Sequence, residues 1–304
     1  GYSVSVDRTG NLYMLGTFLG LVSFGSTTLT GNSDIQTNVL AKYSNSGELI
    51  WAQSFGNIYS QGIRGISTDG SGNVHIAGSF TGTATFGTTT ITNSNYSGVF
   101  GNNHSDVFIA KYNTDGIFLW VKNPIGITSR AFGNSIATDE SGNTYVTGSF
   151  SDSASFGNVI LKSNGQDDMF IVKYDTTGTV LWARNGGGKD YDSGSKVIVD
   201  KLGNIYILGR SPGKADFDGA TLTNNEKTWE LFIVKYDNNG NVVWARNPWG
   251  NQVNDGYYIN NIAVNDSGNL FIVGSFSGTR ELEGTNLNSN GGYDAFAAKL
   301  NSTG

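Results

Sequence analysis

Paired aspartates are the residues of this sequence whose type and spacing come closest to those of a metal site. Asp190 and Asp192 stand before a glycine in K-D-Y-D-S-G, as do Asp216 and Asp218 in K-A-D-F-D-G. Carboxylates two residues apart begin the calcium-binding loops of EF-hands. Neither segment has the remaining ligands of such a loop, and in K-A-D-F-D-G a lysine stands where the first acid belongs. We therefore predict neither a metal ion nor a cofactor.

Acids that stand five residues before a lysine form a second set with the right groups for acid–base or ion-binding chemistry. They recur along the chain, as Asp106, Asp168, Glu230 and Asp294. A catalytic group is normally needed once in an active site, whereas this acid recurs, and Thr37 replaces it at the first equivalent position. We interpret these acids as groups that fix strand ends and contacts between structural units.

The histidines and nucleophiles form no catalytic motif. His75 and His104 are the two histidines, and His75 lies where the equivalent segments have tyrosine or phenylalanine. The sequence has no G-x-S-x-G motif and no histidines at metal-binding spacing. The G-G-G-K segment from Gly186 lacks the upstream glycine and the following Ser or Thr of a phosphate loop. We therefore predict that the protein is not an enzyme, with a hydrolase site assembled across loops as the third alternative.

The six tryptophans divide into a recurrent set and two exceptions. The recurrent set follows a lysine by nine residues each time, at Trp51, Trp120, Trp182 and Trp244. Such rings could stack on sugars, but their fixed place favours packing between units. Trp229 and Trp249 have no counterpart elsewhere, and Trp249 stands in the loop segment N-P-W-G-N-Q-V-N-D-G. An exposed indole at Trp249 would stack on a sugar or a partner, whereas a buried one would be a packing plug.

All these positions belong to an internal repeat. Five versions of one phrase run along the chain: D-x-x-G-N and an apolar run, then D-a-F-a-a-K-Y and G-x-a-a-W, where a is apolar. Its asparagine recurs with spacings of 62, 70, 61 and 65 residues, at Asn11, Asn73, Asn143, Asn204 and Asn269. A single repeat from end to end predicts one domain over 1–304. Its units are approximately 1–56, 57–126, 127–188, 189–250 and 251–304.

Each unit contains four short apolar runs, which in the third unit are SIATD, NTYVTGSF, MFIVKYD and TVLWARN. Their β-branched and aromatic residues, and the glycine-containing turns between them, predict strands. We therefore predict an all-β fold: a β-propeller of about five four-stranded blades with an incomplete last blade, closed as a ring or part of a longer array. Between the second and third runs we expect a small hairpin, with one large residue at the interface between blades: Phe24, Phe86, Phe156, Phe217 or Leu282.

These units resemble a known family. The strings S-G-N-T-Y-V-T-G-S-F, F-I-V-K-Y-D and L-W-A-R-N-G-G-G are similar to the SBBP β-propeller repeats of large secreted proteins of bacterial surfaces. The resemblance extends over essentially the whole chain. It implies a β-propeller and an extracellular or bacterial cell-surface location, and it says little about a ligand. Repeats of this family are named after a seven-bladed ring, whereas five units are present in this sequence.

Composition argues against two classes of partner. Charged residues make up 14% of the chain, the net charge is −6, and lysine and arginine form no cluster. We therefore expect no nucleic-acid binding, which requires a basic face. No apolar run is long enough for a helix to cross a bilayer, so we expect no membrane insertion. The chain has no cysteine with which to form a disulfide.

The loops that join one unit to the next differ most between units, and variable loops on a rigid scaffold are where binding sites arise. They supply our candidate ligand-binding residues: Tyr59, Arg130, Asp190, Asp192, Trp249 and Asp255. We predict a non-catalytic extracellular interaction or display module that binds protein or polysaccharide at the cell surface. The alternative is a carbohydrate-binding, lectin-like propeller.

The last unit reaches Gly304 before any tryptophan segment. We therefore expect a fifth blade of three strands, with an edge that is exposed or completed by further sequence or another chain. Unpaired strand edges recruit other strands, so self-association through the incomplete fifth blade is a further hypothesis. A chain that begins at Gly1 rather than methionine is expected to be a processed product or an excised segment.

Overall fold

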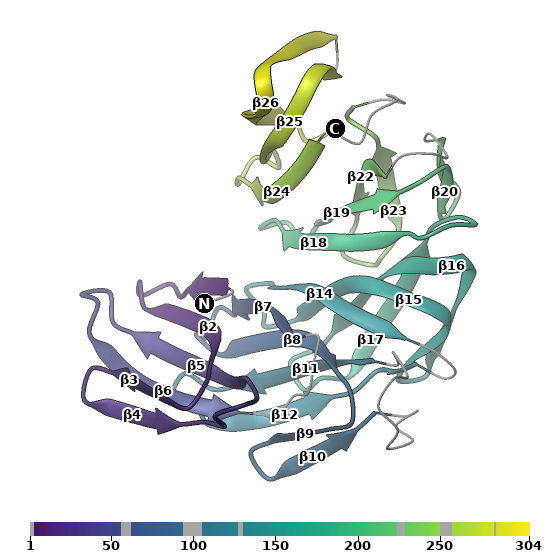
Figure 1. The fold of residues 1–304 in the computed structure, drawn as a ribbon. Helices are drawn as coiled ribbons and strands as arrows, with labels where there is room; N and C mark the ends of the chain where they lie inside the picture. Colours follow the sequence, from purple (N-terminus) through teal and green to yellow (C-terminus); the bar gives the residue numbers. More distant parts are fainter. Residues whose placement is uncertain are drawn as a thin grey trace.

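The computed structural model describes residues 3–55, 62–93, 105–126, 130–223, 229–249, 257–282 and 284–304. These residues form antiparallel strands joined by turns, without a helix among them (Figure 1). The all-β prediction is therefore confirmed. In this described part of the chain, nothing forms a helix of the length and hydrophobicity that a membrane span requires.

Five successive sheets repeat one topology, in which strands that follow one another in the repeat unit are antiparallel neighbours. Sheet 1 consists of β1 (Ser3–Val6), β2 (Leu12–Phe18), β5 (Thr37–Tyr43) and β6 (Leu49–Phe55). Sheet 2 consists of β7 (Ile63–Thr68), β8 (Val74–Phe80), β11 (Asp106–Tyr112) and β12 (Phe118–Lys122). Sheet 3 consists of β14 (Ala131–Thr138), β15 (Thr144–Phe156), β16 (Val159–Tyr174) and β17 (Val180–Gly186), and the short β13 (Ile125–Gly126) also pairs with β15.

Sheet 4 consists of β18 (Ser193–Val199), β19 (Ile205–Ser211), β22 (Glu230–Tyr236) and β23 (Val242–Arg246). Sheet 5 has three strands, β24 (Tyr257–Val264), β25 (Leu270–Leu282) and β26 (Thr285–Leu300). The expected three-stranded fifth unit is therefore confirmed.

The expected hairpin between the second and third strands is also present. It is a separate two-stranded ribbon in three units: β3 (Leu21–Phe24) with β4 (Thr27–Thr30), β9 (Thr83–Phe86) with β10 (Thr89–Thr92), and β20 (Lys214–Phe217) with β21 (Ala220–Thr223). In sheets 3 and 5 the same hairpin is the continuation of the two long central strands.

The D-x-x-G-N segments are tight turns whose polar groups satisfy one another. In the first unit, Asp7 Oδ1 accepts hydrogen bonds from the backbone N–H groups of Thr9 and Asn11, both at 2.9 Å, and Asn11 Nδ2 donates to Asp7 Oδ2. Gly10 has a φ of +84°, which favours glycine. An aspartate that binds the backbone two residues later is a strong local turn former, which explains why the phrase recurs before each second strand.

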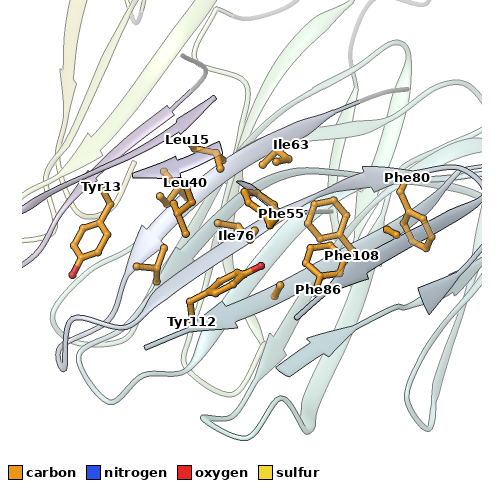
Figure 2. Packing of buried hydrophobic residues seen from close by; sticks show 14 residues of the cluster. Tyr13, Leu15, Leu40, Phe55, Ile63, Ile76, Phe80, Phe86, Phe108 and Tyr112 are labelled. Carbon is orange, nitrogen blue, oxygen red and sulfur yellow. The ribbon is translucent and has the colours of Figure 1, made fainter. Parts of the chain in front are cut away.

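The hydrophobic core is a series of four clusters, and each cluster joins two neighbouring sheets. Figure 2 shows the first, in which Tyr13, Leu15 and Leu40 of sheet 1 lie beside residues of sheet 2. The hairpin phenylalanines Phe86, Phe156 and Phe217 are fully buried in these clusters. Their predicted position between units is therefore confirmed, while Phe24 and Leu282 at the two ends are half-buried.

The recurrent tryptophans join each sheet to the next. The indole Nε1 donates to a carbonyl oxygen in the turn after the third strand of the following unit, at 3.1–3.3 Å: Trp51 to Thr114, Trp120 to Thr176, Trp182 to Asn238 and Trp244 to Ser302. We call this contact the indole latch. Two residues after each acceptor is a glycine with positive φ that lies against the indole: Gly116, Gly178, Gly240 and Gly304. The interpretation of these tryptophans as packing residues is confirmed.

The sheets follow one another in an open arc (Figure 1). The first strands of consecutive sheets pack in series, β1 on β7, β7 on β14, β14 on β18 and β18 on β24. No comparable packing joins sheet 5 to sheet 1 among the described residues. A closed ring is therefore not formed by this part of the chain.

Candidate functional site

The loop 186–192 between sheets 3 and 4 brings together three of the predicted binding residues. Arg130, just before β14, forms an ion pair with Asp167 of β16, with Nη2 and Oδ1 3.3 Å apart. The backbone N–H of Asp192 donates to the carbonyl oxygen of Asp167 at 2.6 Å, and Asp190 lies two residues earlier in the same loop. Arg130, Asp190 and Asp192 therefore meet around one segment of β16, although they come from two units.

Two exposed aromatic rings extend this surface. Tyr191 and Trp229 are 38% and 46% exposed, and their rings stack with centroids 6.4 Å apart and planes 29° apart. The Arg130 guanidinium lies 5.9 Å from the Tyr191 ring centroid, within reach of a cation–π contact. We call Arg130, Tyr191 and Trp229 the aromatic platform. A flat apolar face beside a fixed cation can stack on a sugar ring or on a partner's side chain.

Sequence reasoning predicted one of the three platform residues. Arg130 is one of the predicted residues, while Tyr191 and Trp229 are not. The absence of any tryptophan at the place of Trp229 in the other units was the one signal that pointed to it. Its stacking on Tyr191 joins a loop to the start of β22, a contact that no local pattern in the sequence indicates.

The three glycines that open the loop allow it to pass close to its neighbours. A Cβ at Gly186 would clash with the Phe217 ring, and one at Gly188 would clash with the Lys214 carbonyl. A Cβ at Gly187 would lie 2.7 Å from Asp168 Oδ1 and 2.7 Å from Asp192 Oδ2. The G-G-G segment is therefore explained by close backbone packing, which places the aspartates and Tyr191.

Asp192 supports the loop and does not contact a ligand. Its side chain is fully buried, and Oδ2 accepts a hydrogen bond from the Gly188 N–H at 2.6 Å. Burial, and then the charges of Asp168 and Asp190, raise the pKa of Asp192 to about 7. Burial also raises the pKa of Asp168. The prediction of Asp192 as a ligand-binding residue is wrong, because a side chain without exposed surface cannot reach a ligand.

The remaining predicted residues lie apart from the platform. Trp249 is 2% exposed and packs edge-on against Phe296 of sheet 5, with centroids 5.0 Å apart. It is a packing plug between sheets 4 and 5, and the hypothesis of an exposed indole is wrong. Tyr59 and Asp255 lie outside the described residues. A groove of about 590 Å³ between sheets 1 and 2, lined by Thr85 and Tyr112 among others, includes none of the predicted residues.

Comparison with known families identifies the repeat. Residues 120–150 match the family described as SBBP, beta-propeller repeat. The chain contains an SBBP repeat. The matched segment includes the latch residue Trp120, the strand β14, the turn that begins at Asp139 and the start of β15. The SBBP resemblance expected from the sequence is therefore confirmed for residues 120–150.

Two longer proteins are similar in sequence to this chain. The chain is 29% identical over 178 residues to the regulatory protein FlaEY of Caulobacter vibrioides, covering 56% of this chain and 18% of that protein. It is 30% identical over 237 residues to the uncharacterized WD repeat-containing protein L264 of Acanthamoeba polyphaga mimivirus, covering 66% of this chain and 17% of that protein. The chain thus spans less than a fifth of these curated relatives.

A solved structure shares the fold. The crystal structure of a Dyadobacter fermentans protein of unknown function aligns with 99% of this chain and 78% of its own, with a TM-score of 0.51 and 11% identity. At this identity the likeness concerns the fold alone.

The recurrent polar residues of the repeat units are used in packing. Asp106, Asp168 and Glu230 are fully buried; Asp106 and Glu230 begin β11 and β22, and Asp168 lies in the second half of the long strand β16. The tyrosine hydroxyls of Tyr13, Tyr145 and Tyr206 donate to the turn aspartates Asp7, Asp139 and Asp200 at 3.0–3.2 Å. Within the described part of the chain, no group of three or more His, Cys, Asp or Glu side chains has the arrangement of a metal site.

His75 replaces one of these tyrosines in the second unit. Its Nε2 donates to Asp69 Oδ2 at 3.1 Å, which leaves Nδ1 to accept from the Thr144 hydroxyl at 2.8 Å. The three residue types are those of a hydrolase triad, but His75 and Thr144 are fully buried. Burial, opposed by Asp69, lowers the pKa of His75. This Asp69–His75–Thr144 arrangement gives a substrate no access and holds sheets 2 and 3 together.

Proposed function

We propose that this chain is a non-catalytic interaction module, a segment of about five β-propeller blades in a secreted or cell-surface protein. Sheets 1 to 5 are then its blades, and the platform of Arg130, Tyr191 and Trp229 is its contact surface. The carrying observation is the exposed Tyr191–Trp229 stack beside the fixed Arg130 guanidinium. The recurrent lysines and tryptophans donate to carbonyl groups of the following unit, and the recurrent acids Asp106, Asp168 and Glu230 are buried. Both observations support a module without a catalytic centre.

Protein or polysaccharide of the cell surface is the proposed partner class. Exposed Tyr, Trp and Arg are enriched where proteins bind one another, because they combine large apolar area with polar contacts. The net charge of −6 disfavours polyanions as partners.

A carbohydrate is the second candidate ligand, favoured by the geometry of the platform. Two partly exposed aromatic rings offer apolar surface, which suits the apolar face of a sugar, and Arg130 can donate to its hydroxyl groups. Asp167 fixes the guanidinium at 3.3 Å, so that it loses little freedom on binding.

Trp229→Ala and Arg130→Ala are expected to weaken ligand binding by about tenfold or more, as expected for central aromatic and Arg contacts. A glycan array and a panel of cell-surface proteins, each probed with the labelled chain, would identify the ligand and measure the effect. Tyr293→Ala is the matched control, because Tyr293 is 57% exposed on sheet 5, outside the platform. If a ligand binds both variants as tightly as the unchanged chain, the platform is not its binding site. If one free sugar competes saturably with the bound ligand, the carbohydrate-binding function is the correct one.

A further inference from the structure

The first sheet exposes a side chain that every later sheet buries. Val4 of β1 is 60% exposed. The equivalent residue, three before the turn Asp or Asn, is 3–7% exposed in sheets 2 to 5: Ile66, Ile136, Val197 and Ile262. In those sheets it packs on the preceding sheet within one of the shared core clusters. The open face of sheet 1 therefore has the chemistry of an internal junction.

The last sheet shows the complementary pattern. Phe271 and Val273 of β25 are 40% and 44% exposed. The residues equivalent to Phe271 are 0% exposed in the other sheets: Tyr13, His75, Tyr145 and Tyr206. Those equivalent to Val273 are 0–1% exposed: Leu15, Ala77, Thr147 and Leu208. Sheet 5 therefore presents the face that sheets 1 to 4 use to bury the next sheet.

Two further contacts of the internal junctions are not made at these faces within the described chain. Gly47 has no atom within 4 Å of its Cβ position, whereas the equivalent glycines of later units each lie against an indole of the preceding sheet. Lys299 is exposed, whereas Lys42 and Lys235, its equivalents, are buried and donate to the carbonyls of Thr114 and Ser302 in the following unit. The equivalent acceptor for Lys299 is the carbonyl of Asn45 in the turn of a sheet 1.

The internal junctions show how the two open faces would meet. At the junction of sheets 2 and 3, the first strand β14 of the following sheet packs on β7, β8 and β11, the first three strands of the preceding sheet. Sheet 5 has these three strands as β24, β25 and β26, and sheet 1 has the first strand β1. Among the described residues of one chain, the two ends of the arc do not pack on each other (Figure 1). Each end offers the kind of surface that an internal junction places on the other.

We propose that copies of this chain associate head to tail, with the Val4 face of sheet 1 of one copy packed on the Phe271 and Val273 face of sheet 5 of another. In this contact, β1 of one copy packs on β24, β25 and β26 of the other. Lys299 of the second copy then donates to the Asn45 carbonyl of the first. Such a contact joins two different surfaces, so it continues from copy to copy unless the rotation closes a ring.

Three Val→Asp variants test this contact in the full chain by sedimentation velocity over a range of concentrations. Val4→Asp and Val273→Asp each place a charge on one open face. Val243→Asp is the matched control, because Val243 is 53% exposed and its equivalents in the first three units, Ile50, Leu119 and Leu181, are exposed too. We expect the unchanged chain and Val243→Asp to associate as concentration rises, and Val4→Asp and Val273→Asp to stay monomeric.

Mixing the two face variants distinguishes head-to-tail association from any other kind. Val4→Asp keeps an intact sheet 5 face and Val273→Asp an intact sheet 1 face, so an equal mixture is expected to form a heterodimer and nothing larger. Circular dichroism would confirm that each variant folds. An unchanged chain that is monomeric at all concentrations overturns the proposal. So does association of either face variant with itself, or a mixture that remains monomeric while the unchanged chain associates.

Discussion

Replacing Trp182 with alanine is expected to lower the free energy of unfolding by about 3–5 kcal/mol, the usual cost of truncating a buried aromatic residue. Trp182 is buried in the cluster that joins sheets 3 and 4. Its Nε1 is one of two donors to the Asn238 carbonyl, at 3.1 Å, and Lys173 is the other. The indole also covers Gly240, at which a Cβ would lie 2.8 Å from the ring. Alanine would leave a cavity at a junction that no other side chain can fill.

Urea unfolding followed by fluorescence and circular dichroism would measure this loss. Trp229→Ala is the control, because its ring is 46% exposed and surface changes usually alter stability by no more than about 0.5 kcal/mol. Trp182→Phe would retain part of the ring and lose the hydrogen bond, so its cost is expected to be intermediate. If Trp182→Ala were no more costly than Trp229→Ala, the indole latch would not be a principal contact between sheets.

The repeat made the strands predictable. Period-2 runs bounded by D-x-x-G turns are local signals, and they predicted the four-stranded sheets, the hairpins and the three strands of the last unit. The recurrence of Trp51 and its equivalents favoured packing over ligand binding, because the same contact occurs at every junction. The indole acceptor, a carbonyl in the following unit, was not predictable, because it lies 56–63 residues further along the chain.

The candidate site was predictable only in outline. Loop variability pointed to Arg130, Asp190 and Asp192, and they do meet, but burial depends on neighbours that are remote in sequence. Asp192 is buried because Gly187 and Gly188 let the loop approach Asp168 and Lys214. Trp249 is buried because sheet 5 covers it. An arc with open ends is a property of all the junction angles together, and no single unit encodes it.

Asp192→Asn is expected to stabilise the protein near pH 7.5 and to flatten the dependence of stability on pH. The pKa of Asp192 is about 7 in the fold, raised by burial and by Asp168 and Asp190, against 3.8 for an ordinary aspartate. The folded state thus binds the proton more tightly than the unfolded state. Stability from this group is present below about pH 4 and falls as the pH rises to about 7, where the folded carboxyl ionises. About three pKa units correspond to on the order of 4 kcal/mol.

Urea unfolding midpoints at several pH values between 4 and 8 would check this expectation. The control is Asp216→Asn, because the exposed Asp216 carboxylate accepts hydrogen bonds from the Gly219 N–H at 3.0 Å and the Thr221 hydroxyl at 2.7 Å, and its pKa is lowered. That group has the opposite sign: it contributes stability that is present above the ordinary aspartate pKa and lost in acid. Asp216→Asn should therefore leave the fall in stability between pH 4 and 7 in place. The contrary result is a stability of the Asp192→Asn protein that falls over that range as steeply as that of the unchanged protein. That result would show that ionisation of Asp192 inside the fold does not cause the loss of stability.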